Sequence, residues 1–127
     1  MAEPMGQPSP ILDINVTRTG DVLAVAVTGE LDIDTVPEVR AAISSGLSDP
    51  TSALVLDLSE IGFFSSAGLS LLLETRGRVG TLAIVATQRA VLRPIQLTSI
   101  APLLNVFGSV DGALASIPSV QGAGQPK

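Results

Sequence analysis

The chain has 127 residues, which fits one domain, and 46% of them are hydrophobic, so a buried core can form. It contains no cysteine and no histidine, which excludes disulfides, thiol chemistry, Cys/His zinc sites and mechanisms that need a histidine base. The net charge of -5 makes nucleic acids and anionic membrane surfaces poor partners.

The two ends of the chain differ in composition from the part between them. Residues 1–10 are rich in proline, and residues 118–127 are rich in proline, glycine and glutamine, so we expect flexible tails around one domain over residues 11–117. The first ten residues lack the basic and apolar regions of a signal peptide, and no apolar run approaches the ~18 residues that a membrane span needs. We therefore expect a cytoplasmic protein that does not contact a membrane.

The first third of the domain predicts a hairpin followed by a helix. Residues 11–17 alternate between apolar and polar and indicate an edge strand, whereas residues 21–28 are apolar on both faces and indicate a central strand. Between them, Gly20 marks a tight turn. The next segment resembles a capping box, in which Thr35 caps a helix and Glu38 reaches back. The apolar face of that helix is predicted to comprise Val36, Val39, Ile43 and Leu47.

The rest of the domain predicts alternating strands and helices. We expect a strand over residues 52–58, a loop over 59–64, a strand over 81–86 and a weak strand over 103–107. A helix is expected to start at the two serines Ser65 and Ser66 and to end at Gly80 as C-cap. After the serines, helical spacing is followed by Leu69, Leu72, Leu73, Arg76 and Val79.

Two further helices are predicted near the carboxyl end. Thr87 is expected to cap a short helix that Pro94 kinks or ends, and Ser109 to cap the last helix. The resulting order, β-β-α-β-α-β-α-β-α, predicts an α/β fold with a mixed, mainly parallel sheet and helices packed on it.

Few residues offer catalytic or cofactor chemistry. Neither a GxGxxG nor a GxxxxGK[ST] loop is present, so no phosphate-cradling loop of either kind is predicted. The acids Glu30, Asp32 and Asp34 follow a strand closely, but we expect turn and capping roles for them, and a metal site would need further oxygen ligands. The prediction is a protein that is no enzyme and holds no cofactor or metal.

The segment GFFSSAGL at residues 62–69 stands out. One serine is expected to be the N-cap of the helix, and a hydroxyl at a helix N-terminus is exposed at a position where the helix dipole favours an added phosphate. Gly68 in the first turn lowers helix propensity by ~1 kcal/mol relative to alanine, which indicates a close approach of some group to the backbone.

Two motifs resemble those of one known family. The sequence VLDLS at residues 55–59, followed by FFSSAGL at 63–69, resembles the signature of the STAS-domain anti-anti-sigma factors, also called anti-sigma factor antagonists. The earlier TGELD at residues 28–32 is similar to the family's GELD segment. The resemblance covers about residues 11–117 and implies a STAS-like domain that works as a switch in bacterial transcription control.

The resemblance also implies partners and a modification site. In this family the unphosphorylated protein binds an anti-sigma factor that is also an ATP-dependent serine kinase, which releases the sigma factor. The kinase then phosphorylates the antagonist on the serine two residues before the motif glycine, and a serine phosphatase reverses this. That position here is Ser66.

The match departs from the family pattern at two positions. Ser65 stands where the family usually has aspartate, and Ala67 where it has a second serine or threonine, which leaves Ser66 as the expected phosphoacceptor. The surface around it that meets the kinase is expected to include Asp32, Thr35, Ser65, Ala67, Gly68 and Leu69. The alternative is a non-phosphorylated STAS module, a structural subunit of a lipid transporter or a stress-signalling scaffold, in which Ser66 serves the helix terminus alone.

Overall fold

The computed structural model describes residues 12–117. The predicted tails, 1–10 and 118–127, and Ile11 at the start of the predicted domain lie outside the described residues. The elements of the described part follow one another in this order: β1 (Leu12–Thr19), β2 (Val22–Leu31), α1 (Val36–Gly46), β3 (Ala53–Phe64), α2 (Ser66–Arg76), β4 (Thr81–Val85), α3 (Arg89–Leu97), the 3-10 turn η1 (Ala101–Leu103), β5 (Asn105–Phe107) and α4 (Val110–Ala115). Apart from η1, this is the predicted order.

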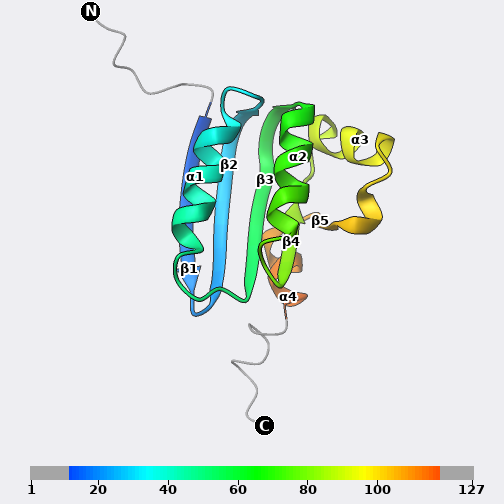
Figure 1. Cartoon of the computed structure of the whole chain (residues 1–127). Helices are drawn as coiled ribbons and strands as arrows, with labels where there is room; N and C mark the ends of the chain where they lie inside the picture. Colours follow the sequence, from blue (N-terminus) through cyan, green and yellow to red (C-terminus); the bar gives the residue numbers. More distant parts are fainter. Residues whose placement is uncertain (1–11, 118–127) are drawn as a thin grey trace, which may run out of the picture.

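The five strands form one sheet in the order β1-β2-β3-β4-β5 (Figure 1). β1 and β2 pair antiparallel as a hairpin, and every other neighbouring pair is parallel. Gly20 makes the hairpin turn with a φ of 62°, a backbone conformation that glycine adopts without steric strain. The predicted mixed, mainly parallel sheet with an antiparallel edge is therefore confirmed.

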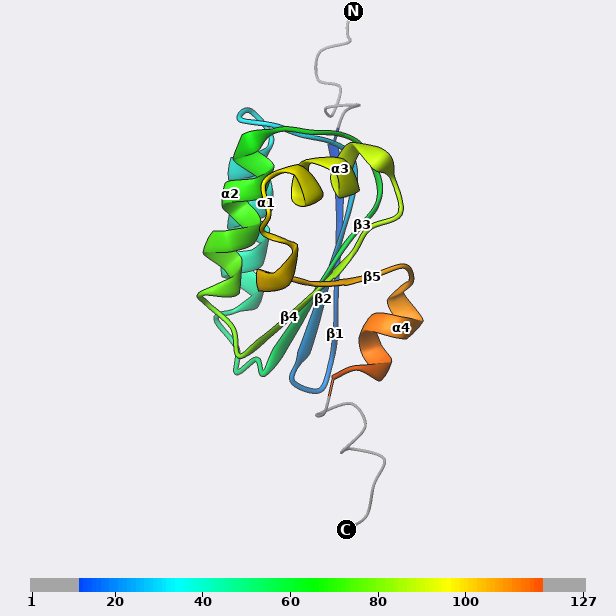
Figure 2. The ribbon, with the colours of Figure 1, turned by 90° about the vertical axis from the view of Figure 1, so that its right-hand side faces the viewer.

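The sheet carries helices on both faces, and the two faces have separate cores (Figure 2). The larger core lies beneath α1, α2 and α3 and includes Leu23, Ile43, Leu72 and Ile95. The smaller core lies beneath α4 and includes Val22, Val55, Val85 and Ala113. Because β2 and β3 contribute to both cores, they are apolar on both faces, as the sequence pattern predicted for β2.

The predicted loop over residues 59–64 is wrong, because β3 continues to Phe64. The pairing of β3 with β2 shifts its register twice, between Ala26 and Thr28 and between Gly29 and Glu30. Each shift changes which face a residue occupies, so Leu58, Ile61 and Phe64 all reach the larger core at spacings of three. This spacing breaks the two-residue alternation by which a strand is recognised in a sequence.

Helix α2 also differs from its prediction. It ends at Arg76 with Gly77 as C-cap, not at Gly80. The residues it buries are Gly68, Leu71, Leu72 and Thr75, whereas Leu73 is 40% exposed. Burial of Thr75 is tolerated because its hydroxyl donates a hydrogen bond of 2.7 Å to the Leu71 carbonyl.

The carboxyl-terminal predictions are confirmed in part. The Ser109 hydroxyl accepts a hydrogen bond from the Gly112 amide and caps α4, as expected. The predicted cap at Thr87 is wrong: Gln88 precedes α3, and the Thr87 hydroxyl donates to the Ser59 carbonyl instead. Pro94 lies inside α3, which continues to Leu97, and β5 is shorter than predicted because residues 101–103 form η1.

Candidate functional site

The predicted site residues meet at one end of the sheet, at the carboxyl ends of the neighbouring strands β2 and β3. The last residues of these parallel strands, Leu31 and Phe64, are paired in register, and the Ser65 amide donates a hydrogen bond of 3.0 Å to the Leu31 carbonyl. The segment after β2 leads to the amino end of α1, and Ser65 leads to the amino end of α2 (Figure 1). Segments about 30 residues apart in the sequence are thereby placed side by side.

The two serines have different roles in the helix terminus. Ser65 is the N-cap of α2, because its hydroxyl oxygen accepts a hydrogen bond of 3.2 Å from the Ala67 amide. Ser66 is the first residue of the helix and is exposed, and within residues 12–117 its hydroxyl has no hydrogen-bond partner. The prediction that one serine is the N-cap is confirmed, and the capping serine is Ser65.

The loop after β2 is held by Thr35 and Asp32. The Thr35 hydroxyl donates to the Glu30 carbonyl at 2.9 Å and accepts from the Asp32 amide at 2.9 Å. The Asp32 carboxylate accepts from the amides of Asp34 and Thr35, at 2.9 and 3.1 Å, which is the turn role expected for these acids. The loop is therefore rigidly connected to the end of β2.

The predicted capping box at the start of α1 is wrong. Thr35 is the residue before α1, but its side chain makes no capping hydrogen bond. Its hydroxyl turns inward to the loop instead, and the residue is only 4% exposed. Thr35 therefore positions the loop from beneath the surface.

Gly68 is buried against the ring of Phe64. The close approach that a glycine in the first turn indicated is thus made by a side chain of the same chain. The six residues predicted to surround the phosphoacceptor differ in exposure: Asp32, Ser65, Ala67 and Leu69 are half-buried, and Thr35 and Gly68 are buried.

Two exposed apolar side chains flank the serines, and the sequence analysis missed both. Ile33, at the tip of the loop after β2, is 77% exposed, and Phe63, next to the last residue of β3, is 50% exposed. The register places Phe63 opposite Glu30. The available signals were an isoleucine between two aspartates in a segment expected to be a turn, and two adjacent phenylalanines, which point to opposite faces when the segment is a strand.

A hollow of about 410 Å³ opens between the amino-terminal halves of α1 and α2, and we call it the α1–α2 hollow. The residues that line it are Ile33, Val36, Pro37, Arg40, Ser66, Ala67 and Ser70. Arg40, one of the lining residues, forms a salt bridge with Glu74 of α2, with 3.0 Å between Nε and Oε2. Both side chains are about two-fifths exposed, and pairs of this kind contribute at most about 1 kcal/mol to stability.

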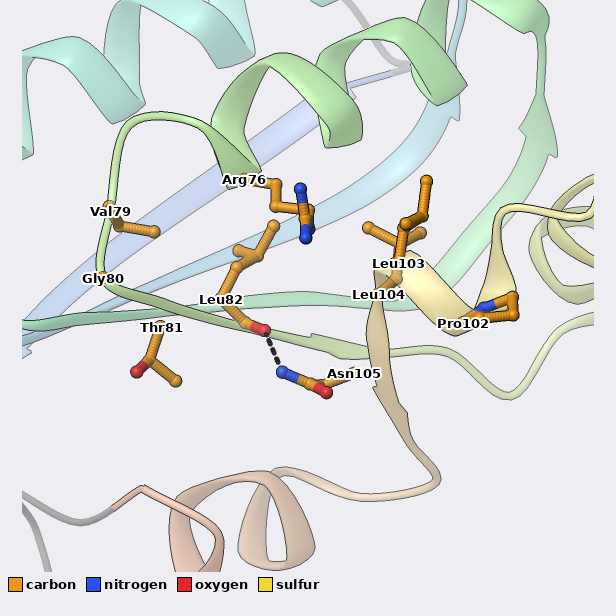
Figure 3. Close-up of a pocket in the computed structure, with 9 residues that line it drawn as sticks. All are labelled: Arg76, Val79, Gly80, Thr81, Leu82, Pro102, Leu103, Leu104 and Asn105. Carbon is orange, nitrogen blue, oxygen red and sulfur yellow. Dashed lines mark hydrogen bonds between the residues drawn. The ribbon is translucent and has the colours of Figure 1, made fainter.

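A second hollow lies at the opposite end of α2, beside the first residues of β4 (Figure 3). Asn105 donates a hydrogen bond of 3.2 Å from its side-chain nitrogen to the Leu82 carbonyl in its wall, and Arg76 and Leu103 flank it. Because this hollow adjoins the carboxyl end of α2, it is separate from the site at Ser66.

The described part of the chain offers neither a metal-binding cluster nor a membrane-spanning helix. Within residues 12–117, no three acidic side chains gather in a way that could hold a metal ion, and Glu30, Asp32 and Asp34 are included in that finding. None of the helices over the same residues has the length and apolar character to cross a membrane.

Comparison with known proteins gives consistent matches. The family model of the STAS domain matches residues 13–113. The anti-sigma-F factor antagonist RsfB of Mycobacterium tuberculosis is 29% identical over 109 residues, which cover 84% of this chain and 89% of that protein. The crystal structure of an anti-sigma factor antagonist from Mycobacterium paratuberculosis superposes with a TM-score of 0.80 at 33% identity, covering 86% of this chain and 97% of that one. The unphosphorylated form of the anti-sigma factor antagonist SpoIIAA shares the fold, with a TM-score of 0.69 at 19% identity over 87% of this chain and 97% of its own.

Proposed function

Because this chain belongs to the STAS domain family, we propose that it is an anti-sigma factor antagonist switched by phosphorylation of Ser66. In its unphosphorylated form it binds an anti-sigma factor with serine kinase activity, and the sigma factor is released. The kinase phosphorylates Ser66, which ends the binding, and a serine phosphatase restores it. The protein acts in the cytoplasm as the substrate and ligand of its partners and performs no catalysis itself.

The observation that carries this proposal is the division of roles between the two serines. Ser65 caps α2, so the hydroxyl of Ser66 is not needed for the cap. Within residues 12–117 this hydroxyl has no hydrogen-bond partner, and the residue is exposed. A phosphate on Ser66 would leave the cap intact and would lie at the positive end of the helix dipole. The folded state can therefore accept the modification without losing the cap of α2.

The exposed apolar side chains beside Ser66 support a partner-binding surface. Ile33 lines the α1–α2 hollow together with Ser66, and Phe63 lies two residues before Ser65 in the chain; both side chains are exposed and available to a partner. Asp32 lies in the loop after β2, Ser65 and Ala67 adjoin Ser66 in the chain, and these three half-buried residues contribute the polar and small contacts. Thr35 and Gly68 support this surface from below.

Charge explains how phosphorylation would end binding. A phosphate adds roughly −1.5 to −2 charges. The acids Glu30, Asp32 and Asp34 belong to the adjoining strand end and loop, so the surface is already acidic. A partner that fits a neutral hydroxyl would have to desolvate or repel this added charge, and a loss of even ~2.8 kcal/mol weakens affinity about a hundredfold.

The test is incubation with ATP and a cognate anti-sigma kinase, followed by intact mass and tandem mass spectrometry. Wild-type protein and the Ser65→Ala variant are expected to gain one phosphate on Ser66, and Ser66→Ala is expected to gain none. Calorimetry should give an affinity for the kinase about a hundredfold weaker for the phosphorylated protein. Phosphate uptake by Ser66→Ala at the wild-type level would refute the assignment, and no uptake by the wild type would favour the non-phosphorylated structural module.

A further inference from the structure

We propose that Arg40 binds the phosphate group when Ser66 is phosphorylated, and that it leaves Glu74 to do so. The inference rests on the proposed modification of Ser66 and names the residue that receives the phosphate within the protein. It concerns a phosphate monoester, a group to which a guanidinium can donate two parallel hydrogen bonds.

The placement of Arg40 between two positions on α2 carries the proposal. Ser66, Ser70 and Glu74 follow one another at intervals of four residues, so they lie in a row along one face of α2, with about 6 Å of rise between neighbours. Arg40 bonds to the last of the three and lines the α1–α2 hollow together with the first two. Its side chain therefore contacts Glu74 and borders the same hollow as Ser66.

The present partner of Arg40 holds it weakly. The Nε and Nη2 atoms donate to the Glu74 carboxylate at 3.0 and 3.1 Å, but both side chains are about two-fifths exposed, and solvent-exposed pairs contribute little because water and salt screen them. A second partner with a larger charge can therefore compete for the guanidinium.

A phosphate on Ser66 would be such a competitor. It carries up to two charges and three acceptor oxygens, and the planar guanidinium can donate to two of them at once. In the described part of the chain, Arg40 is the one basic residue that lines the α1–α2 hollow. Arg78, the neighbouring cation on this side, donates to Ser44 near the other end of α1.

The same exchange gives the acidic surface a compensating charge. Asp32 and Asp34 lie in the loop beside the amino end of α2, so a dianion on Ser66 adds like charge to this edge. A guanidinium moved from Glu74 to the phosphate offsets part of that repulsion and stabilises the dianionic form. The second pKa of the phosphoserine, ordinarily about 6, should then be lowered.

The experiment measures that pKa by phosphorus NMR on protein with phosphoserine installed at position 66 during synthesis. In wild type the second pKa is expected to be about half a unit or more below its value in Arg40→Gln. Arg78→Gln is the matched control, because it removes the same charge from the adjacent cation, and it should change the pKa much less. Glu74→Gln should lower the pKa further, and this effect should disappear when Arg40→Gln is also present.

Equal pKa values in wild type and Arg40→Gln, or equal shifts in Arg40→Gln and Arg78→Gln, would overturn the proposal. Circular dichroism of each variant confirms that it is folded, which is expected because both arginines are exposed or half-buried. Since the phosphoserine is installed without a kinase, failure of the kinase assay would refute the proposed function and leave this measurement unaffected. Conversely, loss of the pKa shift would refute the role of Arg40 alone.

Discussion

The ring of Phe64 lies so close to Gly68 that a Cβ atom on the glycine would come within 2.7 Å of Phe64 Cε1. Phe64 is the last residue of β3 and is 6% exposed, and Gly68 lies in the first turn of α2. The contact packs the strand end against the helix start, with Ser65 and Ser66 between them. It therefore sets where the exposed hydroxyl of Ser66 emerges.

Replacement of Gly68 by alanine should destabilise the protein by up to about 2 kcal/mol. Alanine improves helix propensity by ~1 kcal/mol, but a buried ring has little room to move, and overpacking typically costs about 1–3 kcal/mol. Urea denaturation monitored by circular dichroism measures the difference. Gly77→Ala is the control on the same helix, because a Cβ there would meet its nearest atom at an ordinary 3.5 Å. Equal stability of the two variants would contradict the role of the ring.

The two serines should differ in their effect on stability. Ser65→Ala removes the cap of α2 and should reduce the free energy of unfolding by about 1 kcal/mol, whereas Ser66→Ala removes no hydrogen bond and should change it by less than about 0.5 kcal/mol. Ser65→Asp should retain nearly full stability, because a carboxylate oxygen can accept the same hydrogen bond. Thermal denaturation of the three variants, measured at one pH and salt concentration, gives their order of stability. The reverse ranking of the alanine variants would show that the cap is assigned to the wrong serine.

Loss of the Thr35 hydroxyl should loosen the loop after β2. Thr35→Val keeps the shape of the side chain but leaves the Glu30 carbonyl and the Asp32 amide without this partner, which should cost about 2 kcal/mol. Thr35→Ser retains the hydroxyl and loses one methyl group, so about 1 kcal/mol is expected. Guanidinium denaturation separates the two, and a serine variant less stable than the valine variant would argue against the hydrogen bonds.

Replacement of Ser99 by glycine should make the protein more stable. Its φ of 60° lies in the left-handed region that glycine adopts without strain, so Ser99→Gly is expected to stabilise the protein by about 1 kcal/mol. Gly20 provides the reciprocal test, because it has a φ of 62° with open space around it. Gly20→Ala should destabilise by a similar amount through the backbone alone. Scanning calorimetry of both variants should give melting temperatures that move in opposite directions.

The sequence by itself determined the element order and the mixed sheet, and the resemblance of its motifs to those of one family indicated the family. The element order follows from properties local to each segment: apolar residues at intervals of two or about three and a half, a turn residue at Gly20, and a capping serine at Ser109. The motif GFFSSAGL is also local, and its resemblance to the family signature allowed the candidate phosphoacceptor to be named without coordinates. The spacing of apolar residues within one segment can be read without knowing which other segments pack against it.

Only the tertiary structure decided what depends on two segments at once. The length of β3 follows from register shifts against β2, and the inward turn of the Thr35 hydroxyl follows from its hydrogen bond to the Glu30 carbonyl. The exposure of Phe63 and the burial of Phe64, adjacent and identical in the sequence, were decided by the face of the sheet that each occupies. The meeting of Arg40, Ser66 and Glu74 likewise requires α1 and α2 to lie side by side, because packing between distant segments leaves no periodic signal in either one.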